Sequence, residues 1–139
     1  MTVITKTVHL QSKGNVDIID ITDKVAELLK ESNLKDGIVT VFVPGSTGAI
    51  TTIEYEPGLV EDLANALERM APQEMEYKHN LKWGDGNGHS HVLASLLGPS
   101  ETIPFSNAKL MLGTWQQVVF IDLDNQPRSR RLILQIIGV

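Results

Sequence analysis

The sequence predicts an α+β domain with a largely antiparallel sheet and two or three helices. Two observations predict this class. Short β-branched runs outnumber the helical segments, and several of these runs follow one another directly instead of alternating with helices. The chain has 139 residues, of which 42% are hydrophobic and 21% charged. This length and composition indicate one folded domain, residues 1–139, with its own core.

The N-terminal third predicts two strands and a helix. Residues 3–10 and 16–21 alternate apolar and polar side chains, and Gly14-Asn15 between them marks a turn, so we expect the two strands to pair as a hairpin. Thr22 is the expected N-cap of a helix that ends near Asn33.

The middle third predicts two more strands and a long helix. Residues 38–43 form a β-branched run, residues 44–48 interrupt it, and a strand resumes over 49–55. Pro57-Gly58 begins a helix that runs to about Met70, with apolar side chains on one face.

The last third predicts a short helix followed by four strands. Residues 73–88 show no periodicity, and irregular segments of this length often carry function. A helix is expected over 89–97. Strands are expected over 101–105, 108–112, 116–123 and 130–137. Residues 133–137 are nearly all apolar, which places the last strand in the centre of a sheet.

Composition excludes several classes of function. Twelve Lys and Arg against 17 Asp and Glu give a net charge of -5, which argues against a nucleic-acid partner. The absence of cysteine excludes disulfides, thiolate nucleophiles and cysteine metal sites. No apolar run is long enough to cross a membrane, so we expect no membrane partner. The first residues do not resemble a secretory signal, which makes the cytoplasm the expected location.

Three histidines gather in the irregular segment and the helix after it: His79, His89 and His91. Three imidazoles can bind zinc or a similar divalent ion and leave one position open for water. Solvated or core histidines, and acid–base or substrate-binding roles, are the alternatives. If His89 and His91 both lie in the helix, they project about 200° apart and cannot reach one ion.

Two segments offer groups that bind anions. In residues 45–48, the hydroxyls of Ser46 and Thr47 and flexible backbone N–H groups can cradle an anion, although a simple kink between strands explains the same residues. A basic cluster near the C-terminus can bind phosphate or form a basic turn: Arg128, Arg130 and Arg131.

Two further residues stand near turns. Glu54 follows a strand, where a carboxylate acts as a general base, ligates a metal or is merely exposed. Trp115 lies close to a turn, and we expect it to pack in the core.

Six segments carry a resemblance that runs in order along nearly the whole chain. They are residues 41–44, 51–54, 87–98, 102–104, 112–116 (Leu-Gly-Thr-Trp-Gln) and 128–131. Together they resemble the YjbQ-like family, also called secondary thiamine-phosphate synthase, and the Leu-Gly-Thr-Trp-Gln motif is the most specific of the six.

The resemblance implies a small α+β domain that assembles as a homotrimer, with clefts near the subunit contacts. It also implies a reaction on phosphorylated small molecules, in which a pyrimidine pyrophosphate and a thiazole phosphate give thiamine phosphate and pyrophosphate. The candidate site that it implies consists of His79, His91, Glu54 and residues 128–131.

One segment departs from the family pattern. Many members carry His-Thr-Thr/Ser-Ala where this chain has residues 45–48, so that histidine is absent, and His89 stands where many members lack one. We therefore hypothesise that His89 supplies the missing imidazole in the same pocket.

The resulting interpretation is an enzyme of thiamine-phosphate synthase type that uses a divalent metal, Zn or Mg. The metal and the arginines would neutralise the leaving pyrophosphate, and Ser46 and Thr47 would bind phosphate oxygens. The histidines would hold the metal or donate protons, with Glu54 as base or orienting carboxylate. The alternatives are a metal-assisted phosphoester hydrolase and a non-catalytic trimeric binding module.

Overall fold

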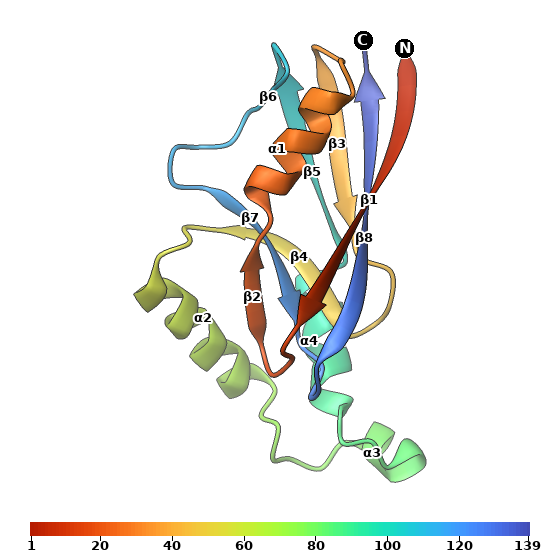
Figure 1. Cartoon of the computed structure of the whole chain (residues 1–139). Helices are drawn as coiled ribbons and strands as arrows, with labels where there is room; N and C mark the ends of the chain where they lie inside the picture. The colour runs from red at the N-terminus through yellow and green to blue at the C-terminus, as the bar shows by residue number, and fades with distance from the viewer.

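A computed structural model describes residues 1–139. Its strands form two antiparallel sheets (Figure 1). The five-stranded sheet has the order β1-β8-β3-β5-β6 and the three-stranded sheet the order β2-β7-β4. The strands are β1 Thr2–Ser12, β2 Asp17–Asp20, β3 Gly37–Phe42, β4 Gly48–Ile53, β5 Ser100–Ser106, β6 Lys109–Leu110, β7 Gln117–Asp122 and β8 Arg128–Gly138. The helices are α1 Thr22–Glu31, α2 Pro57–Met70, α3 Lys78–Trp83 and α4 Gly88–Leu97.

The predicted α+β class with an antiparallel sheet is confirmed, and so is the central place of the last strand. β8 lies between β1 and β3, and its inward residues Leu132, Leu134 and Ile136 are buried. α1 packs Val25, Leu28 and Leu29 into the same core. A second core joins α2 and α4 to the three-stranded sheet through Leu67, Leu93 and neighbouring side chains.

The predicted N-terminal hairpin is wrong. β1 pairs with β8 over its whole length, whereas β2 pairs with β7 in the other sheet. Gly14 and the two residues after it have positive φ, so the chain turns sharply from one sheet into the other at this point. Strand alternation alone does not say which partner a strand takes.

Two local predictions are also corrected. Ile21, not Thr22, is the N-cap residue of α1, and it makes no side-chain cap hydrogen bond; Thr22 is the first helical residue, and its hydroxyl accepts a hydrogen bond from the N–H of Val118 (2.8 Å). Trp115 does not pack in the core: it is 73% exposed on the segment between β6 and β7.

The outer face of the five-stranded sheet has no helix over it. α1 covers the inner face, while Val3, Ile38 and Phe42 on the outer face remain exposed. Separately, none of the four helices is both long and apolar enough to cross a lipid bilayer.

Candidate functional site

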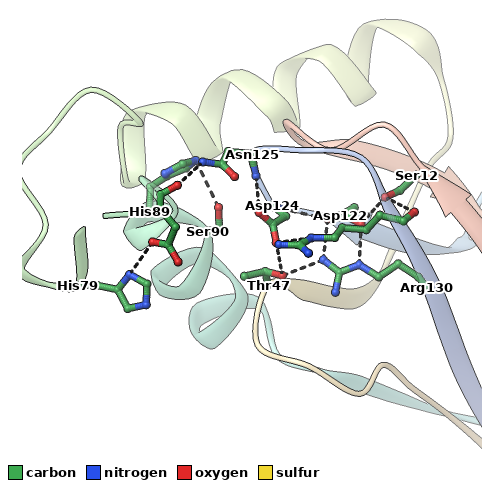
Figure 2. A network of polar contacts seen from close by, with 11 residues as sticks. Ser12, Thr47, His79, His89, Ser90, Asp122, Asp124, Asn125 and Arg130 are labelled. Carbon is green, nitrogen blue, oxygen red and sulfur yellow. Dashed lines mark hydrogen bonds and ion pairs between the residues drawn. The ribbon is translucent and has the colours of Figure 1, made fainter. Parts of the chain in front are cut away.

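A buried network of charged side chains holds the loop between β3 and β4. Arg130 donates from Nε to Oδ2 of Asp122 (2.7 Å), and from Nη2 to Oδ1 of Asp122 (2.8 Å) and to Oγ1 of Thr47 (2.8 Å) (Figure 2). Thr47 in turn donates to Oδ2 of Asp124 (3.1 Å), which also accepts from Nε of Arg128 (3.0 Å). The network therefore holds the loop in place through the buried hydroxyl of Thr47.

The Asp122 carboxylate is held in its ionised form by its neighbours. Burial by itself raises the pKa of Asp122, but hydrogen bonds from Arg130, Ser12 and the N–H of Asp124 together lower the pKa below its ordinary value. The hydrogen bond to Asp122 raises the pKa of Arg130, which stays positively charged. Asp122 and Asp124 are thus positioning residues for the arginines, and the sequence analysis missed both.

One edge of the Arg130 guanidinium remains available to a ligand. Its Nε and Nη2 atoms are engaged, while Nη1 makes no hydrogen bond and faces the loop: a Cβ on Gly45 would lie 3.5 Å from Nη1. Gly45 has φ +110°, a conformation that favours glycine, so the backbone can approach the guanidinium here. Nη1 of Arg130 and the loop therefore offer N–H donors to an anion, while the charge of the guanidinium is balanced by Asp122.

A cavity of about 240 Å³ lies at this loop. It is lined by Gly45, Ser46 and Gly48 on one side and by Ala94, Ser95 and Pro99 on the other. Ser46 is exposed, so its hydroxyl is accessible from solvent. The hydroxyl of Ser95 donates to the backbone carbonyl of His91 (2.9 Å). Residues four apart in a helix share one face, which places His91 one turn from the cavity.

His91 is paired with His79 from α3. Their ring centroids are 4.5 Å apart, and Nδ1 of His79 lies 3.6 Å from Oδ1 of Asp85. The side-chain amide of Asn87 is satisfied when its nitrogen is turned toward Asp85. In that orientation the nitrogen donates a hydrogen bond to Oδ1 of Asp85 (2.9 Å). Asn80 accepts from the N–H of Gly88 at the start of α4 (2.9 Å). These contacts hold the two imidazoles together.

Polar contacts join the histidine pair to the arginine network. The side-chain amide of Asn125 donates to the backbone carbonyl of Asp85 (2.9 Å), and the backbone N–H of Asn125 donates to Oδ1 of Asp124 (2.8 Å). Figure 2 shows this path from His79 to Arg130. Through Asn125 and Asp124, the irregular segment is therefore linked to Thr47 of the loop, whereas direct convergence of the histidines with the loop hydroxyls stays a prediction.

His89 does not join the other two histidines. Residues 88–97 are helical, so His89 and His91 project to different sides of α4. His89 is 5% exposed and lines a separate cavity with Asn65 and Glu68 of α2. The hypothesis that His89 replaces the missing family histidine at residues 45–48 is therefore wrong.

The structure contains no group of three His, Asp or Glu side chains placed to hold one metal ion. His79, His89 and His91 consequently do not fit the expected three-histidine site within one chain. Nδ1 of His79 and Nδ1 of His89 are buried without hydrogen-bond partners, but only His89 lines a cavity, and the two do not belong to one group of candidate metal ligands.

Two other predicted site residues lie elsewhere. Glu54 follows β4 at the end opposite the loop, which a strand rise of about 3.3 Å per residue places roughly 20 Å away. It lines a different cavity with Tyr55 and Trp115. Arg131 is exposed and, as the next residue along β8, points to the sheet face opposite Arg130.

The comparisons with known proteins identify the family. Residues 6–139 match the description "UPF0047 protein YjbQ-like". This chain belongs to the YjbQ-like UPF0047 family. A UPF0047 protein of Methanothermobacter thermautotrophicus is 40% identical over 138 residues, covering 99% of this chain and 94% of the relative. A UPF0047 protein of Archaeoglobus fulgidus is 40% identical over 126 residues, covering 91% and 95%.

Solved structures of family members have the same fold. A YbjQ-like protein of unknown function from Sulfolobus solfataricus superimposes with a TM-score of 0.94 at 33% identity, covering 99% of both chains. A hypothetical protein from Aeropyrum pernix gives a TM-score of 0.91 at 32% identity, covering 98% of this chain and 99% of that chain. The YjbQ-like fold is therefore shown for the whole chain.

Proposed function

We propose that this protein is an enzyme that binds a phosphorylated small molecule at the loop between β3 and β4. The observation that carries the proposal is the free Nη1 edge of Arg130, which faces Gly45 while Asp122 and Thr47 hold the rest of the guanidinium. Gly45 also lines the cavity of about 240 Å³, which has room for a phosphoryl group, while Arg130 itself is not among the lining residues. A rigidly held guanidinium and backbone N–H groups are the donors that stabilise charge on a phosphate.

The reaction that we propose is of the thiamine-phosphate synthase type. The thiazole nitrogen attacks the methylene carbon of the pyrimidine pyrophosphate and forms an N–C bond. The C–O bond to pyrophosphate breaks, and its electron pair leaves on the pyrophosphate oxygen. Arg130 and the loop would stabilise that charge, and Ser46 would donate a hydrogen bond to a phosphate oxygen. His91, one helical turn from Ser95 and paired with His79, would donate a further hydrogen bond in this proposal.

No step is assigned to a metal, because the three histidines do not converge within one chain. Metal binding by the His79–His91 pair stays a prediction. Elemental analysis of the purified protein and of the His91→Ala variant tests it, since unchanged metal content in the variant would remove His91 from the ligands.

Assembly as a homotrimer is part of the proposal, as is a location in the cytoplasm. Support for assembly comes from the outer face of the five-stranded sheet, where Ile38 and Phe42 are exposed with no helix over them. An uncovered apolar sheet face is typical of a surface that contacts another chain.

The decisive assay measures release of pyrophosphate and phosphate from each precursor alone and from both together. Pyrophosphate release that requires both precursors supports the synthase reaction. Phosphate release from a single substrate would favour the hydrolase alternative, and no release from any of them would favour a non-catalytic binding module.

Two variants connect the assay to the loop. Ser46→Glu places a negative charge in the anion site and should abolish turnover. Thr2→Glu adds the same charge far away, since Thr2 pairs with Gly138 at the end of β8 opposite Arg130, and should leave turnover unchanged. Equal activity in both variants would place the reaction elsewhere on the molecule.

A further inference from the structure

The largest cavity in the molecule lies away from the candidate site. Its volume is about 520 Å³, and its lining comes from α1, from β6 with the turn before it, from the segment that joins β6 to β7 and from the start of β7. Cavities of about 300–1,000 Å³ are the usual size for small-molecule sites. None of the residues that form the anion site at residues 45–48 lines it.

Most of the Leu-Gly-Thr-Trp-Gln motif lines this cavity. Of residues 112–116, only Trp115 is absent from the lining. Gln116 fixes the segment, because its side-chain oxygen accepts from the N–H of Gly113 (3.1 Å) and its side-chain nitrogen donates to Oγ1 of Thr52 (3.1 Å). The Leu-Gly-Thr-Trp-Gln motif thus forms one wall of the cavity in a fixed conformation, and the proposed reaction gives this motif no role.

The charge of the lining has one sign. Lys30 of α1 and Lys109 of β6 both line the cavity, and no Asp or Glu does. Neither lysine forms an ion pair, whereas Lys24 on the same helix pairs with Glu27 (3.6 Å). In a chain of net charge -5, a cavity with two unpaired ammonium groups is a local site of positive potential.

The rest of the lining is suited to an apolar body. Ala26, Leu110 and Leu112 supply hydrophobic surface from both walls, and polar groups such as Gln117 stand among them. An apolar bed with a few convergent polar or charged groups is the usual make-up of a small-molecule site.

We propose that this cavity binds an organic carboxylate with an apolar body, with Lys30 and Lys109 facing the carboxylate. This second site is independent of the proposed reaction at residues 45–48. A negative binding result here would therefore leave the proposed reaction untouched, and an absence of pyrophosphate release would leave this binding site untouched.

The test uses the full chain and octanoate as the probe. Octanoate and octylammonium, which carry opposite charges on the same apolar chain, are titrated in turn, with isothermal calorimetry and backbone amide NMR as readouts. We expect octanoate to bind and to shift the amides of residues 108–113, and octylammonium not to bind. Equal binding of the two probes, or no binding of octanoate at millimolar concentration, would overturn the proposal.

Variants locate the site. Lys30→Gln and Lys109→Gln should each weaken octanoate binding by about fivefold, as expected for the loss of one charge contact. Lys24→Gln is the matched control on the same helix and should bind octanoate like the wild type. Ala26→Trp fills the cavity from an exposed position and should abolish binding with an unchanged circular dichroism spectrum.

One further outcome counts against the proposal. If Ala26→Trp lowers the oligomer mass and octanoate does not bind, then the cavity receives a second copy of this chain instead of a carboxylate.

Discussion

The substitution Asp122→Asn removes the charge that holds Arg130 in place. The side chain of Asp122 is 0% exposed and that of Arg130 10% exposed, and their shortest contact is 2.7 Å. Removing one partner of such a buried pair costs about 3–5 kcal/mol, because the remaining charge stays buried without compensation. For a domain of this size, we expect the melting temperature to fall by about 10–20 °C.

The assay is urea unfolding followed by circular dichroism at several pH values. Because the pKa of Asp122 is lowered in the folded state, its stabilising contribution is complete above the unfolded pKa and is lost as the pH falls through the folded pKa. The free energy of unfolding of the wild type should therefore fall below about pH 4, and part of that fall should be missing in Asp122→Asn.

The control is Asp62→Asn, the same chemical change at an exposed position of α2, which should change the free energy of unfolding by less than about 0.5 kcal/mol. The double variant Asp122→Asn/Arg130→Met should recover part of the loss, since it no longer leaves an unpaired charge. If Asp122→Asn behaves like the control and keeps the wild-type pH profile, the network does not hold the loop as we describe.

Three shorter predictions follow from the same structure. Burial lowers the pKa of His89, so its contribution to stability is present above about pH 6.5 and is lost as the pH falls through its folded pKa. In His89→Phe, the free energy of unfolding should therefore differ less between about pH 5 and pH 7.5 than in the wild type. An unchanged difference would assign the pH dependence to other groups. Sedimentation of the wild type should give a trimer, and Phe42→Glu on the outer sheet face should give monomers; a wild-type monomer would contradict the assembly. Trp115 is 73% exposed and is the only tryptophan left in Trp83→Phe, so iodide should quench most of the fluorescence of that variant; weak quenching there would place Trp115 in the core.

The sequence predicts most of the elements because each is specified locally, but it misses the short helix α3 (Lys78–Trp83) within the segment that shows no periodicity. The apolar face of α2 and the β-branched run of β3 need no information from elsewhere in the chain. Strand partners are different: β1 and β2 carry alternation that suits either sheet, and the sharp turn at Gly14 decides which one each joins. Strand partners that depend on the conformation of a turn cannot be predicted from the periodicity of the strands.

The site was predicted in part. Among the residues that the sequence analysis selected for their hydroxyl, guanidinium or imidazole groups, Thr47 contacts Arg130 (2.8 Å) and His79 lies beside His91. Ser46 is exposed and forms no hydrogen bond with Arg130. Asp122 and Asp124 were missed, although the sequence contains a signal for them. Asp122 and Arg130 are equally far from Gln126 on its two sides, as are Asp124 and Arg128, so a tight turn at Gln126 brings each pair together. Glu54 was misplaced because a strand separates it from the loop by its full length.

The central claim is that Arg130 and the loop between β3 and β4 bind phosphate groups. The most direct measurement is a backbone amide NMR titration of the full chain with inorganic pyrophosphate. We predict saturable shifts at Gly45, Ser46 and Ser95, and their loss in Ser46→Glu. Shifts that gather elsewhere, or that persist in Ser46→Glu, would contradict the claim.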